Sequence, residues 1–65
     1  MSEAAKAALL KLPEKQRTAV ALYVIEGIDC SVIARIMNCS EATVRTHIHR
    51  ARGMLKKMLD EYSDR

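Results

Sequence analysis

The stretch from Ser40 to Leu59, SEATVRTHIHRARGMLKKML, constrains the fold more than any other part of this chain. Its apolar residues recur at helical spacing and form one stripe: Val44, Ile48, Ala51, Leu55 and Leu59. The opposite side carries small, polar and cationic residues: Ala42, Arg45, Thr46, His49 and Lys56. This pattern predicts one amphipathic helix with a basic exposed face. Ser40 stands at the N-cap, where its hydroxyl can accept a hydrogen bond from a free N–H of the first turn.

A shorter helix is expected immediately before this stretch, over residues 30–37. Asp29 is a suitable N-cap for it, and Asn38 is the most common replacement for glycine where a helix ends in a left-handed residue. The inner face of this helix is predicted to consist of Ile33, Ala34 and Met37. A short helix, a turn of about three residues and a longer basic helix together predict a helix-turn-helix.

Two further helices are expected in the first half of the chain. Residues 2–11 are rich in alanine, but a helix this short must dock on another element to be stable. The Leu12–Pro13 step ends it, and Pro13 suits the first position of the next helix. That helix is expected to run to about Glu26, followed by Gly27 in a left-handed conformation. Its expected buried residues are Ala19, Val20, Leu22, Tyr23 and Ile25.

The composition indicates a small all-α domain of three to four helices. The chain has 65 residues with one Pro, two Gly and no Phe or Trp, so its core must be aliphatic. A chain of this size buries only about 60% of its unfolded surface, which leaves little material for a deep catalytic pocket. No run approaches the roughly 18 apolar residues of a membrane span, and no secretory segment follows Met1. We therefore expect a cytoplasmic protein that does not contact membranes.

Positive charge is concentrated on the last predicted helix. The chain has a net charge of +3, and residues 40–59 alone carry five Lys or Arg against one acid, giving +4. Residues 60–65 carry three acids and one Arg, giving −2. A basic helix with a capped, approachable N-terminus suits the major groove of DNA. A surface helix that is basic for solubility, or that binds an acidic protein, would show the same charge pattern.

No metal site, cofactor site or catalytic set is predicted. Cys30, Cys39, His47 and His49 lack the paired spacing that begins a zinc site, and Cys39 is expected to pack as a small hydrophobic residue. A disulfide is not expected in a cytosolic protein. A lone serine or histidine without a base or an oxyanion site is not a nucleophile system, so an enzyme is not expected.

The segments LPEKQR and EGIDCSVIARIMNCSEATVRTHIHRARGML resemble region four of bacterial sigma factors of the extracytoplasmic-function group. The matching positions occur in order and without gaps: Leu12, Pro13, Arg17, Glu26, Gly27, Ile33, Ala34, Thr43, Val44, Arg50, Ala51, Arg52 and Leu55. Two positions depart from the family pattern, which usually has Glu at Val32 and Gly at Asn38. A competing resemblance is to the output domain of two-component and quorum-sensing regulators, but that family lacks the Leu-Pro opening and the Arg-Ala-Arg run.

The resemblance implies a domain that binds the upstream, minus-thirty-five promoter element as part of RNA polymerase holoenzyme. It also implies an apolar pocket for the flap-tip helix of the polymerase β subunit and a possible anti-sigma factor as partner. Complete members carry a second DNA-opening domain, so this chain is expected to be a fragment. The expected organisation is an N-terminal helix or linker over 1–11, the helix-turn-helix domain over 12–59 and a tail over 60–65.

Physical chemistry then assigns roles to residues of the reading helix. Arg45 is long enough for a bidentate contact to guanine O6 and N7. The predicted base-reading residues are Glu41, Ala42, Arg45, Thr46 and His49; among these Glu41 could accept a hydrogen bond from cytosine N4 and Ala42 could meet a thymine methyl. The predicted contacts to the DNA backbone are Arg17, Arg35, Ser40, Thr43, Arg50 and Lys56.

Structural alternatives remain for several of these residues. Arg50 and Arg52 could pair with Glu26 or with the acidic tail instead of contacting DNA. Thr43 could act only in capping, and His49 could be an ordinary surface residue. A function of another class is also open, in which the basic face makes this a helical protein-interaction module with an acidic partner.

Overall fold

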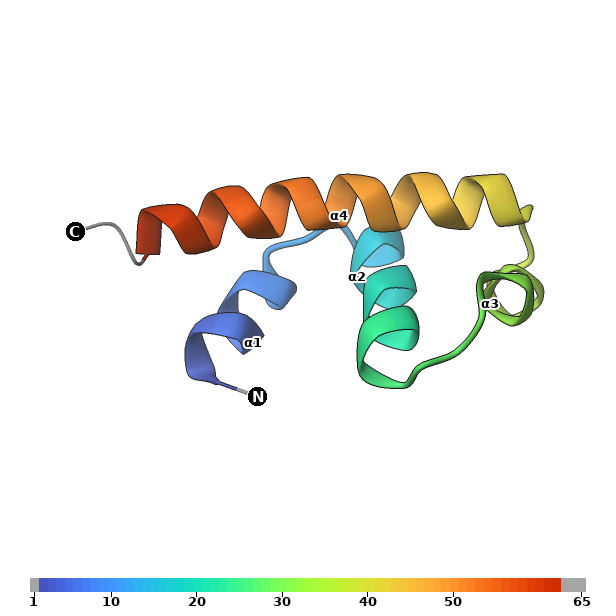
Figure 1. Cartoon of the computed structure of the whole chain (residues 1–65), viewed down its shortest axis with the longest axis horizontal. Helices are drawn as coiled ribbons and strands as arrows, with labels where there is room; N and C mark the ends of the chain where they lie inside the picture. Colours follow the sequence, from blue (N-terminus) through green and yellow to red (C-terminus); the bar gives the residue numbers. More distant parts are fainter. Residues whose placement is uncertain (1, 63–65) are drawn as a thin grey trace.

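Helix α4 (Glu41–Tyr62) runs the length of the molecule, and the shorter helices pack along one side of it (Figure 1). The computed structural model describes residues 2–62. In chain order, the elements before α4 are α1 (Glu3–Leu10), α2 (Glu14–Val20), the π-helical turn η1 (Ala21–Ile25) and α3 (Cys30–Met37). The described residues contain no strand, which confirms the all-α prediction.

The core has two parts, and both are built on the apolar face of α4. The first joins α2, α3 and α4 through Ala19, Ile33, Ala34, Val44 and Ile48. The second is formed by Leu12, Val20 and Ala51, with Leu9, Leu55 and Met58 packed against it. The predicted stripe is therefore confirmed from Val44 to Leu55. Leu59 is 38% exposed, because the α1 side chains beside it are mostly alanines.

The turn between α3 and α4 is built as the sequence predicts. Asn38 has the left-handed conformation, with φ 58° and ψ 52°. Its N–H donates to the carbonyl of Arg35 at 3.3 Å, and the N–H of Cys39 donates to the carbonyl of Ala34 at 2.9 Å. These two bonds satisfy carbonyls that the end of α3 would otherwise leave free. The half-buried Cys39 packs against the core, as expected.

The second helix changes its winding after Val20. The N–H of Glu26 donates to the carbonyl of Ala21, five residues earlier, at 3.2 Å. Beyond it, the N–H of Ile28 donates to the carbonyl of Leu22 at 3.0 Å. A π turn takes up one more residue than an α turn, so side chains in η1 leave the α-helical register. Gly27 then reverses the chain with φ 70°, which confirms its predicted role.

This change of winding overturns part of the predicted core. Ala19 and Val20 are buried and Leu22 is half-buried, in agreement with the prediction. Tyr23 and Ile25 were expected to be buried, but they are 39% and 50% exposed. The expectation was wrong because it assumed α-helical periodicity through a segment that is π-helical.

Three helix ends differ in detail from the expectations. Pro13 is the N-cap of α2, with ψ 148°, and Glu14 is the first helical residue. Asp29 occupies the N-cap of α3, but its side chain makes no capping hydrogen bond; its carbonyl accepts the N–H of Ile33 at 2.9 Å. Helix α4 continues past Leu59 to Tyr62, so the expected tail begins with helical residues, and residues 63–65 lie outside the described part.

Helix α1 docks on α4, which satisfies the expectation that so short a helix needs a partner. Its N-cap is Ser2, whose hydroxyl accepts the N–H of Ala5 at 3.1 Å. At its C-terminal end, the Arg17 guanidinium donates to the carbonyl of Leu10, the last residue of α1, and to that of Leu12, each at 3.4 Å. Arg17 therefore ties the loop between α1 and α2 to the start of α2.

The two glycines give a matched test of backbone conformation. A Cβ added at either Gly27 or Gly53 would have no atom within 4 Å, apart from the adjacent residues and the helix's own backbone. Gly27→Ala should lower the free energy of unfolding by about 1–2 kcal/mol, because an L-residue is strained in the left-handed region. Gly53→Ala, in the interior of α4, should raise it by about 0.5–1 kcal/mol. Thermal and urea unfolding followed by circular dichroism measures both. A Gly27→Ala variant as stable as the wild type would contradict the left-handed turn.

Candidate nucleic-acid interface

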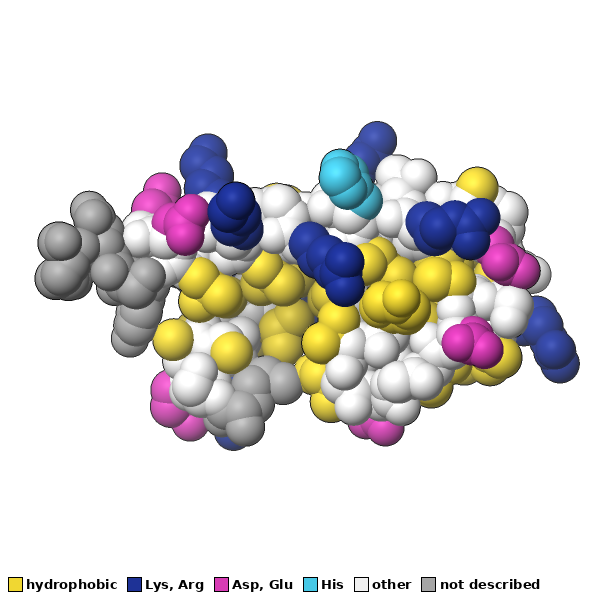
Figure 2. Space-filling view, in the orientation of Figure 1, with side chains coloured by type: hydrophobic (Ala, Val, Ile, Leu, Met, Phe, Trp, Pro, Cys, Tyr) yellow, Lys and Arg dark blue, Asp and Glu magenta, His cyan; other side chains and the backbone are white. Residues whose placement is uncertain are grey.

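The first turns of α4 separate a buried face from an exposed one. Val44 is fully buried and Ile48 is 5% exposed, and both belong to the core that joins α4 to α2 and α3. The predicted base-reading residues are all exposed: Glu41, Ala42, Arg45, Thr46 and His49. Figure 2 shows Lys and Arg side chains spread along the length of α4. The face predicted to enter the groove is therefore open to solvent.

The N-terminus of α4 is capped by its own side chains. The hydroxyl of Ser40 accepts the backbone N–H of Thr43 at 3.1 Å, which confirms the predicted N-cap. The two hydroxyl oxygens of Ser40 and Thr43 are 2.9 Å apart and share a hydrogen bond. Helical geometry still leaves the N–H groups of Glu41 and Ala42 without an intrahelical acceptor. These groups, together with the positive end of the helix dipole, suit an anionic ligand such as a phosphate.

Two of the predicted base-reading side chains contact each other. Arg45 Nη1 lies 3.4 Å from Glu41 Oε1, one turn earlier on the helix. A third, Thr46, uses its hydroxyl to donate to the carbonyl of Ala42 at 3.0 Å. That bond leaves the lone pairs of the Thr46 hydroxyl and its methyl group available to a ligand.

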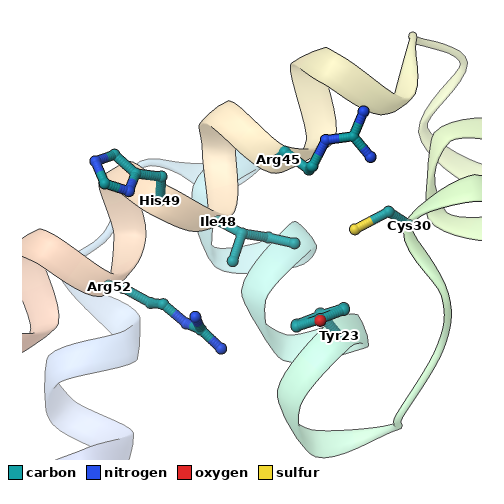
Figure 3. A pocket seen from close by; sticks show the side chains of 6 residues that line it. All are labelled: Tyr23, Cys30, Arg45, Ile48, His49 and Arg52. Carbon is teal, nitrogen blue, oxygen red and sulfur yellow. The ribbon is translucent and has the colours of Figure 1, made fainter.

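A shallow hollow of about 340 Å³ flanks the reading helix on the side of η1 and the start of α3 (Figure 3). Its lining consists of Tyr23, Cys30, Arg45, Ile48, His49 and Arg52. The Arg52 guanidinium carbon lies 5.9 Å from the centre of the Tyr23 ring, within the range of a cation–π interaction. This contact places a second arginine, Arg52, beside Arg45 in the lining of the hollow.

Tyr23 and Arg52 were not predicted to belong to the site. The sequence alternative for Arg52 was an ion pair with Glu26 or the acidic tail, and within residues 2–62 the structure gives it Tyr23 as partner. The sequence offers only a slight signal for this contact, namely that Tyr23 is one of only two tyrosines in the chain. Its position depends on the π turn, which the residue pattern does not reveal.

The predicted backbone contacts do not all share one surface. At 100° per residue, Arg50 lies on the opposite edge of the exposed face of α4 from Arg45. Lys56 lies about three turns beyond Arg45, and Arg35 is exposed on α3. Arg17 is half-buried on α2 and already bonds backbone carbonyls, so the structure gives it a structural contact. Its contact with DNA stays a prediction.

Neither metal-binding nor membrane-spanning features appear in the part of the chain that the structure describes. No group of three or more His, Cys, Asp or Glu side chains comes together there, and Cys30 and Cys39 are free. None of the helices in residues 2–62 combines the length and apolar character needed to cross a bilayer.

An apolar groove of about 350 Å³ opens between α1, the second helix and α4. Its lining consists of Ala5, Leu9, Val20, Ala21, Val24, Ile25, Arg52, Leu55 and Leu59. Val24 and Ile25 are 57% and 50% exposed, and hydrophobic surface reaches solvent below α4 in the space-filling view (Figure 2). A cluster of exposed branched aliphatic side chains around a groove is typical of a protein-docking surface.

The short α3, its left-handed turn and the capped, basic α4 define a helix-turn-helix DNA-binding domain. Comparison with protein families identifies which one: residues 2–55 match the model described as sigma-70, region 4. The chain therefore belongs to the sigma-70 region 4 family, and the resemblance seen in its sequence is confirmed.

Curated sigma factors of three bacteria are similar to this chain. The ECF RNA polymerase sigma factor SigW of Bacillus subtilis is 43% identical over 51 residues, which is 78% of this chain and 27% of SigW. The ECF RNA polymerase sigma-E factor of Haemophilus influenzae is 44% identical over 48 residues, 74% of this chain and 25% of the relative. The RNA polymerase sigma-H factor of Pseudomonas aeruginosa is 45% identical over 49 residues, which is 75% of this chain and 25% of the relative.

The chain spans about a quarter of the length of these relatives. Two of the three carry the ECF designation in their names, which agrees with the group that the sequence motifs indicate. The match supports the sigma-factor interpretation over the output domain of two-component and quorum-sensing regulators.

The N-cap of α4 can be tested independently of any ligand. Ser40→Ala should lower the free energy of unfolding by about 1 kcal/mol, because the N–H of Thr43 loses its acceptor. Ser40→Asp should retain most of the wild-type stability, since an aspartate oxygen caps as well as a hydroxyl. Ser31→Ala, an exposed serine on α3, is the control and should change stability little. Chemical denaturation measures all three, and an unaffected Ser40→Ala variant would contradict the cap.

Proposed function

We propose that this domain binds the upstream, minus-thirty-five promoter element in double-stranded DNA as part of bacterial RNA polymerase holoenzyme, and so directs transcription initiation in the cytoplasm. The observation that carries the proposal is the separation of faces on α4. Its first three turns present polar and cationic side chains to solvent, while Val44 and Ile48 fix the helix on α2 and α3. Membership of the sigma-70 region 4 family supports the same assignment.

In this proposal the first turns of α4 enter the major groove. Arg45 forms a bidentate hydrogen bond with guanine, a contact worth about 1–3 kcal/mol of discrimination. Ala42 packs against a thymine methyl, while Thr46 and His49 contact neighbouring base edges. The exposure of all four side chains on one side of the helix makes these contacts sterically possible.

Contacts to phosphate set the register of the domain on the duplex. Ser40 and Thr43 bring the free N–H groups at the start of α4 to one phosphate. Arg35, Arg50 and Lys56 bind others by charge, with Arg50 on the far edge of the exposed face from Arg45. Arg17 already donates to the carbonyls of Leu10 and Leu12. It would bind a phosphate through the guanidinium N–H groups that these two bonds leave free.

The apolar groove is the proposed docking site for the flap-tip helix of the polymerase β subunit. Its exposed aliphatic rim, Val24 and Ile25, lies on η1, apart from the base-reading side chains of α4. DNA and polymerase can therefore be bound at once. An anti-sigma factor that covered either surface would prevent promoter binding.

Base reading and phosphate binding predict different outcomes for two arginines of α4. Arg45→Ala should reduce the free-energy difference between the correct and an incorrect base by about 1–3 kcal/mol at one base pair of the selected sequence. Arg50→Ala should weaken binding to all sequences by a similar factor and reduce the salt slope by about one. Selection from random duplexes, with the chain assembled on polymerase core, identifies the sequence; fluorescence anisotropy across a salt series measures the affinities.

Lys57→Ala is the control, because it removes one positive charge from the C-terminal half of α4. It should leave the base preference unchanged. If the wild-type chain selects no sequence on polymerase core, or binds duplexes without any salt dependence, the proposed function is wrong. Tight binding to an acidic protein in place of DNA would favour the interaction-module alternative.

The groove makes a separate prediction about polymerase. Ile25→Glu should weaken binding to the β flap at least tenfold, because it buries a charge against an apolar helix, while leaving DNA binding by the free chain unchanged. Ile36→Glu is the matched control, since Ile36 is a similarly exposed isoleucine on α3, outside the groove. Surface plasmon resonance against isolated polymerase core measures the difference. Equal loss in both variants would contradict the groove as the docking site.

A further inference from the structure

Glu41 and Arg45 form an ion pair at the start of the reading helix. Their nearest atoms, Arg45 Nη1 and Glu41 Oε1, are 3.4 Å apart, and the side chains are 63% and 50% exposed for arginine and glutamate respectively. We propose that Glu41 is a positioning residue that holds Arg45 for base reading and makes the interface more selective. This inference rests on the proposed function, because it assumes that Arg45 reads a base.

Glu41 is not needed to begin the helix. The N-cap role belongs to Ser40, whose hydroxyl accepts the N–H of Thr43, and the Thr43 hydroxyl bonds back to Ser40. A capping glutamate would stand at the third helical position, which Thr43 occupies. The carboxylate of Glu41 is therefore free of the cap, and the structure turns it toward Arg45.

The ion pair itself adds little to stability, although the helix dipole favours the charge of Glu41 in the first turn. Exposed ion pairs contribute little to folding, because solvent and salt screen them. A carboxylate at the entrance to the major groove repels the phosphates on either side of it. The only other acids on α4 lie in its last turn, at Asp60 and Glu61, so Glu41 is the one acid on the part of the helix that would enter DNA.

The geometry allows Arg45 to keep its partner while it reads a base. A guanidinium has five N–H donors, and a bidentate contact to guanine uses two of them. In Figure 3 the Arg45 side chain extends along α4 toward the N-terminal end of the helix, away from Arg52. Glutamate followed by a cation four residues later is the favourable order on a helix, which supports this direction.

Two effects on DNA binding follow. A held guanidinium loses less conformational freedom when it meets guanine, so recognition of the correct base improves. A neutralised Arg45 is also less attracted to phosphates in general, so binding to incorrect sequences falls. Both effects increase the ratio of the affinity for the correct DNA sequence to the affinity for other sequences.

The test combines Glu41→Gln, Arg45→Ala and the double variant, with selection from random duplexes by each full chain on polymerase core. Glu41→Gln removes the charge but keeps the length of the side chain. Its preference at the base pair read by Arg45 should fall about two- to fivefold, the value of an exposed ion pair. Affinity for unselected duplexes should rise. In the Arg45→Ala background, Glu41→Gln should change no base preference further.

Glu61→Gln is the matched control, because it removes the same charge from the last turn of α4 and should change no base preference. An unchanged preference at the Arg45 base pair in Glu41→Gln overturns the inference and leaves the proposed function intact. A loss of preference at a different base pair, present also in the Arg45→Ala background, overturns it in favour of Glu41 as a direct reader of cytosine. A wild-type chain that selects no sequence overturns the proposed function and this inference together.

Discussion

The packing of Ile33 and Ala34 on α3 against Val44 and Ile48 on α4 is the interaction on which the rest of the structure depends. Three of these four side chains are 5% exposed or less, and the small Ala34 allows the helices to cross closely. Because this corner fixes the angle between α3 and α4, it decides which residues of α4 reach solvent. The face of α4 that we propose to bind DNA is the one that points away from this contact.

The helix-turn-helix could be predicted because its signals are local. Asn38 and Ser40 act through bonds to residues within five positions of themselves, at the end of α3 and the start of α4. The apolar stripe of α4 is a simple periodicity, and its burial from Val44 to Leu55 followed the pattern. Gly27 was equally predictable, since a left-handed residue favours glycine wherever a helix ends.

The contacts of η1 and α2 could not be predicted from local sequence signals. The π turn between Ala21 and Glu26 shifts every later side chain of that helix, and no residue type in it demands this winding. Tyr23 lies within this turn and contacts Arg52, which is distant in sequence. Arg17 is one of the positions on which the resemblance rests, but its bonds to the carbonyls of Leu10 and Leu12 depend on how α1 docks. Such contacts are decided by tertiary packing rather than by local preference.

Arg52 lines both the hollow beside the reading helix and the apolar groove between α1, α2 and α4. Its position on α4 therefore marks where the proposed DNA-binding and polymerase-binding surfaces adjoin. The hollow lies beside the N-terminal half of α4 and the groove runs along its C-terminal half, and the residue that lines both is Arg52. In the function that we propose, polymerase bound in the groove would hold the same helix that reads the DNA. One continuous helix thus links the two surfaces, whereas the affinity of each surface is set by its own side chains.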